Sequence, residues 1–308
     1  MSLIGIIGSA AGGFLGAAFG GLVAFVFAGI AILIGIAILI GSSDASFLNL
    51  IGLGPFFGPH ISFAGGVAAA AYAAKKGWLD NGRDIVTPLV SLSQPSVLLV
   101  GAGFGVFGYV CQSVIASIDG VGENTDSVAL TVVISAVVVR LIYSKCGIVG
   151  QHCDGKKGMD KYTPCGSHSW LLYQDSFVMT ALLGVFIGAM SSWASFELLR
   201  AYPNAPGVIL LGFAISATSL LFLSVNILVP VTHHITLVSA VAVSLFIEII
   251  DSDAMVVMVG SLAGLVAAIV GQAFARFWLI RGDTHIDPPA SAIWPVTSGL
   301  IFVSTVFQ

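Results

Sequence analysis

No charged side chain occurs in residues 1–43, and most of this stretch is apolar. A helix needs about 20 apolar residues to cross a hydrocarbon core about 30 Å thick. The run Leu3–Ile40 is therefore nearly long enough for two crossings. Because Gly20 and Gly21 permit a tight turn within it, we expect two helices rather than one.

The whole chain shares this apolar character. Charged residues make up 8% of its 308 residues, whereas soluble domains contain about 25%. So few charges cannot cover a water-facing surface, which makes the lipid bilayer the expected partner. In lipid every backbone polar group needs an internal partner, and continuous apolar runs then indicate helices. No basic stripe is present, so we expect no nucleic-acid partner.

Eight further apolar segments can be delimited. Together with two helices in the first run they make about ten crossings. The segments are His60–Ala74, Pro95–Ser117, Ser127–Tyr143, Phe177–Phe196, Gly207–Asn226, Val231–Ile247, Ala254–Trp278 and Pro288–Phe307. The first basic residue is Lys75. A signal peptide begins with positive charge, so we expect the N-terminal run to belong to the membrane structure.

The two halves of the chain resemble each other in an ordered series of short matches. His60-Ile61-Ser62 matches His234-Ile235-Thr236, and each motif follows a proline, Pro55 or Pro230. Further matches pair Val67-Ala68 with Val241-Ala242, Val100-Gly101 and Gly105 with Val259-Gly260 and Gly264, and Thr125-Asp126 with Ile286-Asp287. Their shared order predicts an internal repeat.

Charge in the loops indicates that this repeat is inverted. The loop after the His60 segment contains Lys75, Lys76 and Arg83, whereas the matching loop after the His234 segment contains acidic residues. Cytoplasmic loops collect Lys and Arg, so the two loops lie on opposite sides. An inverted repeat needs an odd number of helices in each half.

We therefore predict an all-α polytopic membrane protein of about ten transmembrane helices, built as two inverted five-helix repeats with short, broken third helices. The first repeat covers residues 1–145, a cytoplasmic linker loop covers 146–175, and the second repeat covers 176–308. We expect a multi-pass protein of the plasma (inner) membrane with its Lys/Arg loops in the cytoplasm.

Inverted repeats are typical of secondary transporters, whose sites lie near the midplane and are formed by discontinuous helices. The third segment of each half follows an irregular, proline-containing stretch, 53–59 or 229–233. Helices that begin at depth present free N–H groups and partial positive charge. This pattern predicts a membrane transporter or channel for a small polar solute, including an anionic one.

Candidate solute-binding residues cluster around the two breaks. Ionisable residues inside a membrane are functional candidates by default, although a histidine at the interface can simply bond the backbone. We expect His60 and His234 to approach each other and line the pathway. The complete predicted set is Asn49, His60, Ser62, Asn226, Thr232, His233, His234 and Thr236.

Other features have mainly structural interpretations. Asp126 and Asp287 each precede a helix, and we expect them to be N-caps. Gly8, Gly12, Gly16 and Gly20 share one helix face, which predicts close packing inside the chain. The alternative use of that face is contact between copies in a homo-oligomer.

The sequence gives weaker support for a metal site or an enzyme. Cys146, Cys153 and Cys165 share a loop with His152 and His168, but at wider spacing than zinc ligands usually have. We expect no metal and no cofactor. The chain contains no G-x-S-x-G, H-E-x-x-H or P-loop motif. The alternative to transport is an intramembrane enzyme that uses the histidines at 60, 233 and 234.

Overall fold

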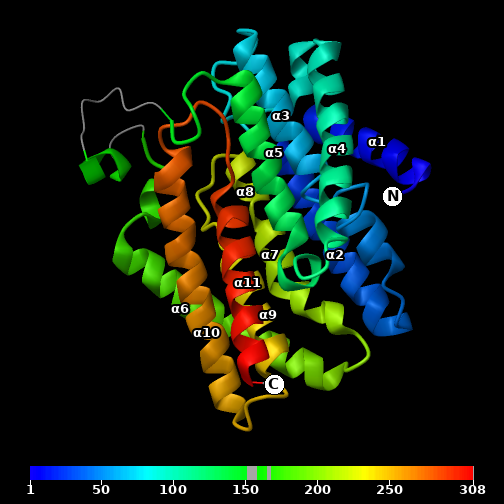
Figure 1. The fold of residues 1–308 in the computed structure, drawn as a ribbon, viewed down its shortest axis with the longest axis vertical. Helices are drawn as coiled ribbons and strands as arrows, with labels where there is room; N and C mark the ends of the chain where they lie inside the picture. Colours follow the sequence, from blue (N-terminus) through cyan, green and yellow to red (C-terminus); the bar gives the residue numbers. More distant parts are fainter. Residues whose placement is uncertain (151–157, 165–167, 308) are drawn as a thin grey trace.

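The computed structural model describes residues 1–150, 158–164 and 168–307. This part of the chain contains eleven α-helices, and an isolated β-bridge joins Gly82 to Thr284. In Figure 1 the helices form one elongated bundle, with the C-terminus at its lower end. The protein is therefore a helical membrane protein, as its composition predicts.

Five helices belong to the first half, residues 1–145. They are α1 (Leu3–Phe19), α2 (Gly21–Ser42), α3 (Ser62–Lys75), α4 (Pro95–Ala116) and α5 (Ser127–Tyr143). The second half, residues 176–308, contributes α6 (Phe177–Ala201), α7 (Leu211–Ser219), α8 (Leu221–Ser224), α9 (His233–Phe246), α10 (Asp253–Phe274) and α11 (Pro288–Phe307).

Six helical segments of the described chain are long and apolar enough to cross a membrane. They are Gly21–Ser42, Pro95–Ala116, Phe177–Ala201, Pro206–Ser224, Asp253–Leu279 and Pro288–Phe307. Three of the remaining helices, α1, α5 and α9, are apolar but shorter. A helix of 17 residues extends about 26 Å, which is less than a hydrocarbon core of about 30 Å. Non-helical chain must cover the remaining distance.

The predicted break in the first run is present. Helix α1 ends at Phe19, Gly20 has φ of 86°, and α2 begins at Gly21. Only glycine adopts such a backbone without steric cost. The predicted segment Gly207–Asn226 is less regular than expected, because a 3₁₀ turn precedes α7 and α8 follows it. The segment ends at Asn226, which has φ of 61°.

Helices α3 and α9 lie at the centre of the bundle. Each has 14 residues, and most of them are buried. A π-helical turn (Leu48–Gly52) and an irregular stretch lead into α3, and the chain ahead of α9 is also non-helical. The short third helices that the sequence predicts are thus the most enclosed elements of the fold.

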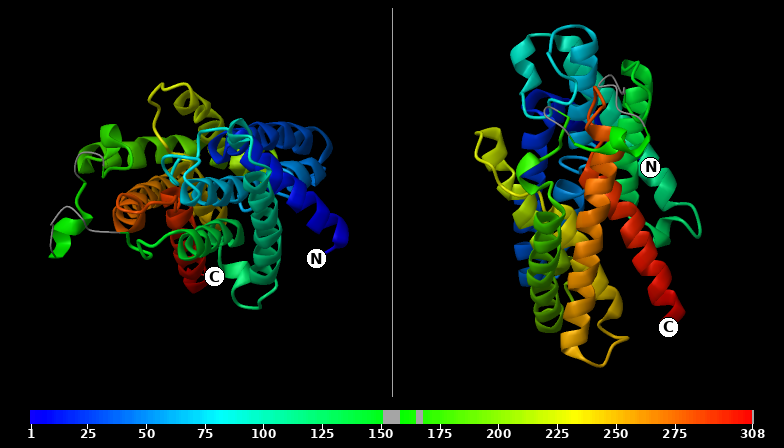
Figure 2. Two further views of the ribbon diagram at one scale, coloured as in Figure 1. Left: turned by 90° about the horizontal axis from the view of Figure 1, so that it is seen from above. Right: turned by 90° about the vertical axis from the view of Figure 1, so that its left-hand side faces the viewer.

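The helix neighbours are the same in the two halves. Helix α1 packs on α3 and α4, and α6 packs on α9 and α10. Helix α3 also contacts α2 and α5, while α9 contacts α7 and α11. The halves meet where α2 packs on α7 and α5 packs on α11. Figure 2 (right) shows α6 and α10 side by side along the long axis.

Small residues permit the closest of these contacts. A Cβ added to Gly13 of α1 would lie 2.7 Å from the Cα of Gly105 on α4. In the second half, a Cβ on Gly188 of α6 would lie 3.3 Å from the Cα of Gly264 on α10. Each pair also adjoins the central helix of its half, at Gly65 of α3 or Ser239 of α9. Backbone-to-backbone packing of this kind is a common basis of helix association in lipid.

The glycine face of α1 is directed into the chain. Gly8 and Gly12 face Pro55, and Gly16 lies against the carbonyl of Ser62. A side chain at Gly12 or Gly16 would collide with that backbone. The predicted internal packing is confirmed, and the face is covered by the protein's own broken stretch.

Basic residues gather at one end of the bundle, which we call the basic end. Lys75 Nζ at the end of α3 donates to the carbonyl of Ile142, 2.8 Å away at the end of α5. Arg83 Nη1 donates to the carbonyl of Leu279 at 3.3 Å. Arg200 lies elsewhere, in an exposed ion pair with Asp253 (2.7 Å) that joins α6 to the start of α10.

Substitution of Gly105 by alanine should lower thermal stability. The new methyl group would lie 2.8 Å from the Cα of Gly13, and overpacking of this kind costs about 1–3 kcal/mol. Gly103 is the matched control, since it lies on the same helix with nothing within 4 Å of an added Cβ. Thermal unfolding in detergent should show a lower midpoint for Gly105→Ala and an unchanged or higher one for Gly103→Ala. Equal midpoints would contradict the proposed close contact.

Candidate functional site

A cavity of about 460 Å³ lies between the two halves. Its walls come from α2, α3 and α5 of the first half and from α7, α9 and α11 of the second. The loop that follows α3 and the segment 169–171 also contribute. Most lining residues are apolar. The polar ones are Asn81, Arg83, Asp126, Ser169, His233, His285 and Asp287.

Two carboxylates in this cavity occupy matching positions in the halves. Asp126 Oδ1 accepts a hydrogen bond from the Ala129 N–H at 2.8 Å, at the start of α5. Asp287 Oδ2 accepts one from the Ala290 N–H, also at 2.8 Å, at the start of α11. The predicted N-caps are therefore confirmed. Each cap uses one oxygen, and a carboxylate has about four lone-pair sites, so both side chains retain capacity to bind a solute.

Two imidazoles lie in the cavity with Asp287. His285 Nε2 is 3.3 Å from Asp287 Oδ1, and the His285 ring contacts the Phe63 ring edge-on at 5.8 Å between centroids. The His233 ring lies 4.8 Å from the Phe25 ring and 5.8 Å from that of Phe213. Titratable groups and aromatic rings thus share the wall.

The positive charge of Arg83 is already engaged by protein. Its Nη1 donates to the carbonyls of Leu279 and Ile280 at 3.3 and 3.4 Å. Carbonyls at the end of a helix carry partial negative charge. Burial lowers the pKa of Arg83, and the nearby Asp283 opposes that shift. An arginine remains protonated at neutral pH, so Arg83 fixes this loop across the cavity.

Arg140 holds the segment that carries His285 and Asp287. Its side chain is 1% exposed at the end of α5. The guanidinium donates to Thr284 Oγ1 at 2.9 Å, to the carbonyl of Ile148 at 2.7 Å, and to the carbonyls of Thr284 and Trp278. A Cβ at Gly282 would collide with the guanidinium, so the segment wraps closely around it.

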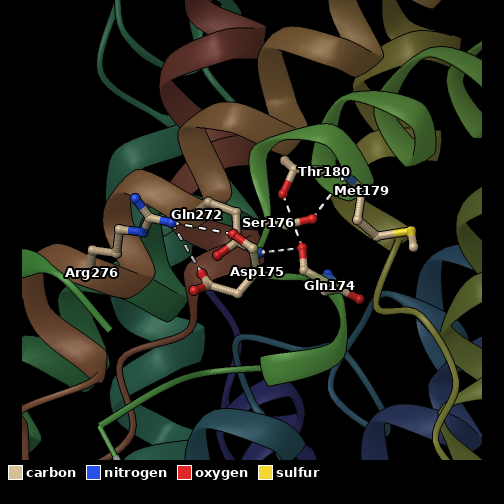
Figure 3. A network of polar contacts seen from close by, with 7 residues as sticks. All are labelled: Gln174, Asp175, Ser176, Met179, Thr180, Gln272 and Arg276. Atoms are coloured by element: carbon tan, nitrogen blue, oxygen red, sulfur yellow. Dashed lines mark hydrogen bonds and ion pairs between the residues drawn. The ribbon is translucent and has the colours of Figure 1, made fainter. Parts of the chain in front are cut away.

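A polar network anchors the chain ahead of α6 (Figure 3). The carbonyl of Gln174 accepts from Thr180 Oγ1 at 3.0 Å and from Gln272 Nε2 at 3.4 Å. Arg276 Nη2 reaches both the carbonyl and the carboxylate of Asp175 at 3.3 Å. The Gln174 side chain accepts from the Val231 N–H at 3.1 Å. These bonds fix the segment that follows Trp170 and Leu171, both of which line the cavity.

Of the predicted histidines, His233 lines this cavity, and His60 and His234 do not. Both of the latter are buried, at 3% and 2% exposure. The carbonyl of His60 packs against Gly108 of α4, and the His234 ring packs against Gly271 of α10. Each of the two therefore packs against a helix of its own half. Contrary to our expectation, neither lines the cavity.

The predicted hydroxyl groups are bonded inside the protein and are absent from the cavity lining. Ser62 Oγ donates to the carbonyl of Phe57 at 3.0 Å. Thr232 Oγ1 and Ser216 Oγ are 2.7 Å apart, and Thr236 Oγ1 donates to the carbonyl of His233 at 3.2 Å. These side chains supply partners that the broken backbone and its neighbours require.

Asn49 and Asn226 differ from expectation. Both are exposed, and neither lines the cavity. Asn226 occupies a left-handed turn after α8, a conformation that asparagine tolerates because its short polar side chain bonds locally. We assign these residues to the surface.

Sequence reasoning assigned Asp126 and Asp287 only as caps and did not consider Arg83 or His285 as site residues. The available signal was the matching position of two acids at the starts of α5 and α11. Among the described residues, no group of three or more His, Cys, Asp or Glu side chains could hold a metal ion. The residues Cys153, Cys165 and His152 of the predicted loop lie outside the described residues.

Comparison with protein families gives one match. The model of a family of unknown function (DUF7973) matches residues 1–167 and 153–308, which together cover the chain. The chain belongs to this family. The two matched parts overlap over residues 153–167, inside the segment 146–175 that was predicted as a linker. No curated protein and no solved structure matches the chain.

Loss of the Arg140 guanidinium should destabilise the protein far more than loss of an exposed arginine. Arg140→Met leaves several buried carbonyl groups without a donor, at about 1–3 kcal/mol for each unsatisfied group. Arg200→Met is the control, since it removes an exposed ion pair worth at most about 1 kcal/mol. Thermal unfolding should show a large loss for Arg140→Met and little for Arg200→Met. Similar midpoints would refute the role given to Arg140.

Proposed function

We propose that this protein is a membrane carrier or channel that binds a small solute in the cavity between its halves. The observation that carries the proposal is the position of this cavity, at the junction of α2 and α5 with α7 and α11. A cavity of about 460 Å³ is within the size range of small-molecule sites. The enclosure of polar groups by apolar walls is also typical of such sites.

Two inverted five-helix repeats with about ten crossings form the architecture of this proposal. The matching helix neighbours support it, as do the paired contacts Gly13–Gly105 and Gly188–Gly264. The location of the matched acids Asp126 and Asp287 in one cavity gives further support. Solute sites of inverted-repeat transporters lie at the interface of the repeats.

The orientation follows from the distribution of charge. Since cytoplasmic loops collect Lys and Arg, the basic end faces the cytoplasm of the plasma (inner) membrane. The loop residues Asn81, Arg83 and Ser169 line the cavity. The loop that carries Arg83 belongs to the basic end, so the cavity is placed toward that side.

The cavity chemistry disfavours the anionic solute that the sequence suggested. Two carboxylates line it, and its arginine is bound to helix-end carbonyls. The alternative is an intramembrane enzyme. Its candidate residues are His233, His285 and Asp287, which replace the histidines at 60, 233 and 234. The contact between His285 and Asp287 favours it.

Replacement of either cavity aspartate by asparagine should reduce transport at least tenfold. Asparagine caps a helix as well as aspartate, so folding should be preserved. Purified protein would first be screened by thermal shift against small amines, amides, amino acids and anions, because a ligand of the folded state raises its stability. Uptake of stabilising solutes into proteoliposomes would then be compared for wild type, Asp126→Asn, Asp287→Asn and the exposed control Asp44→Asn. Chemical conversion of a solute without uptake would favour the enzyme instead.

The topology can be tested without a solute. With five crossings in each half, both termini lie on the side opposite the loop that carries Lys76. Reporter fusions at Met1 and Gln308 should agree with each other and differ from a reporter inserted after Lys76. Termini on opposite sides would exclude an inverted pair of five-helix repeats.

A further inference from the structure

The cavity between the halves contains a connected group of aromatic rings. Phe25 of α2 is central to it, with ring centroids 5.9 Å from Phe63 on α3 and 5.8 Å from Phe213 on α7. The His233 ring lies at 4.8 Å from the same Phe25, tilted by 57°, and His285 contacts Phe63. All five rings line the cavity, and they come from both halves of the chain.

Aromatic rings attract cations through the negative potential of their faces. A desolvated contact of this kind is worth about 2 kcal/mol. Groups of several rings are the usual recognition element for quaternary ammonium ions, which cannot donate hydrogen bonds. The arrangement around Phe25 therefore suits a cation with an apolar surface.

The charges of the cavity agree with this choice. Asp126 and Asp287 place carboxyl groups at two points of the wall. Arg83 supplies positive charge, but its guanidinium is bound to the carbonyls of Leu279 and Ile280. The His285 imidazole lies 3.3 Å from the carboxylate of Asp287.

We propose that the solute of this cavity is a small organic ammonium ion, held by the rings of Phe25, Phe63 and Phe213 with Asp287 as counter-ion. This inference rests on the proposed function and names its solute class. The rings bind the alkyl surface of the ammonium group, and the carboxylate balances its charge. A hydrogen-bonding group on the solute can then reach His233 or His285.

Choline and its uncharged isostere 3,3-dimethylbutan-1-ol form the decisive pair of probes. They have the same shape and differ in the charge of one central atom. Binding to the full-length protein in a maltoside detergent would be measured by calorimetry and thermal shift. Phosphocholine detergents must be avoided, because they carry the proposed ligand group. We expect choline to bind at least tenfold more tightly than the alcohol.

Two cavity variants and one control assign the binding to this site. Phe213→Leu keeps an apolar side chain but removes a ring, and should weaken choline binding about five- to thirtyfold. Asp287→Asn keeps the helix cap and should weaken it at least tenfold. Phe222→Leu is the control, since Phe222 is exposed on the neighbouring α8 and does not line the cavity. It should leave binding unchanged.

The outcomes separate this inference from the proposed function. Equal affinity for choline and the alcohol would overturn cation recognition and leave a solute-binding cavity. No binding of choline would also overturn it, and uptake of another solute that depends on Asp287 would still support a carrier. Choline binding that survives both Phe213→Leu and Asp287→Asn would place the ion elsewhere and overturn the assignment.

Discussion

Lipid offers no hydrogen-bond partner to a peptide group, and the arrangement of this chain follows from that constraint. Regular helices satisfy their own backbone. The stretches ahead of α3 and α9 do not, so their polar groups need partners from the protein or from water. The glycine face of α1 covers Pro55 and the start of α3, while Ser62 and Thr236 bond nearby carbonyls. The stretch ahead of α3 is thus covered by a neighbouring helix, whereas residues 225–228 ahead of α9 are exposed.

Close approach in turn depends on small residues. Lipid tails are as apolar as leucine side chains, so burial of apolar surface does not drive helices together within the bilayer. Van der Waals packing must do so, and it is strongest where backbones touch. The contacts Gly13–Gly105 and Gly188–Gly264 lie at equivalent junctions of the two halves. They hold the short central helices among longer ones.

The cavity lies at the junction of the two halves. Within each half the junctions are closely packed through glycines. Between the halves, Gly29 of α2 also packs on the backbone of α7, and near this contact the rings of Phe25 and Phe213 meet. The cavity lies beside these rings. Helices α5 and α11 begin beside this space, so their capping aspartates, Asp126 and Asp287, are exposed to it. Arg140 and the Gln174 network then fix the segments that complete the wall.

The sequence by itself determined the class of protein, the helical segments and the turn at Gly20. Hydrophobic length, charge content and glycine geometry are local properties that can be read along the chain. It also indicated the pairing of the two halves, because matched motifs persist in order. The identity of the cavity residues was decided by tertiary structure. His60 and His234 share a motif, yet each is packed against a glycine of its own half, whereas Asp126 and Asp287 look like ordinary caps and line one cavity. Which side of a helix faces a neighbouring half depends on how all the helices pack, and no local pattern encodes that relation.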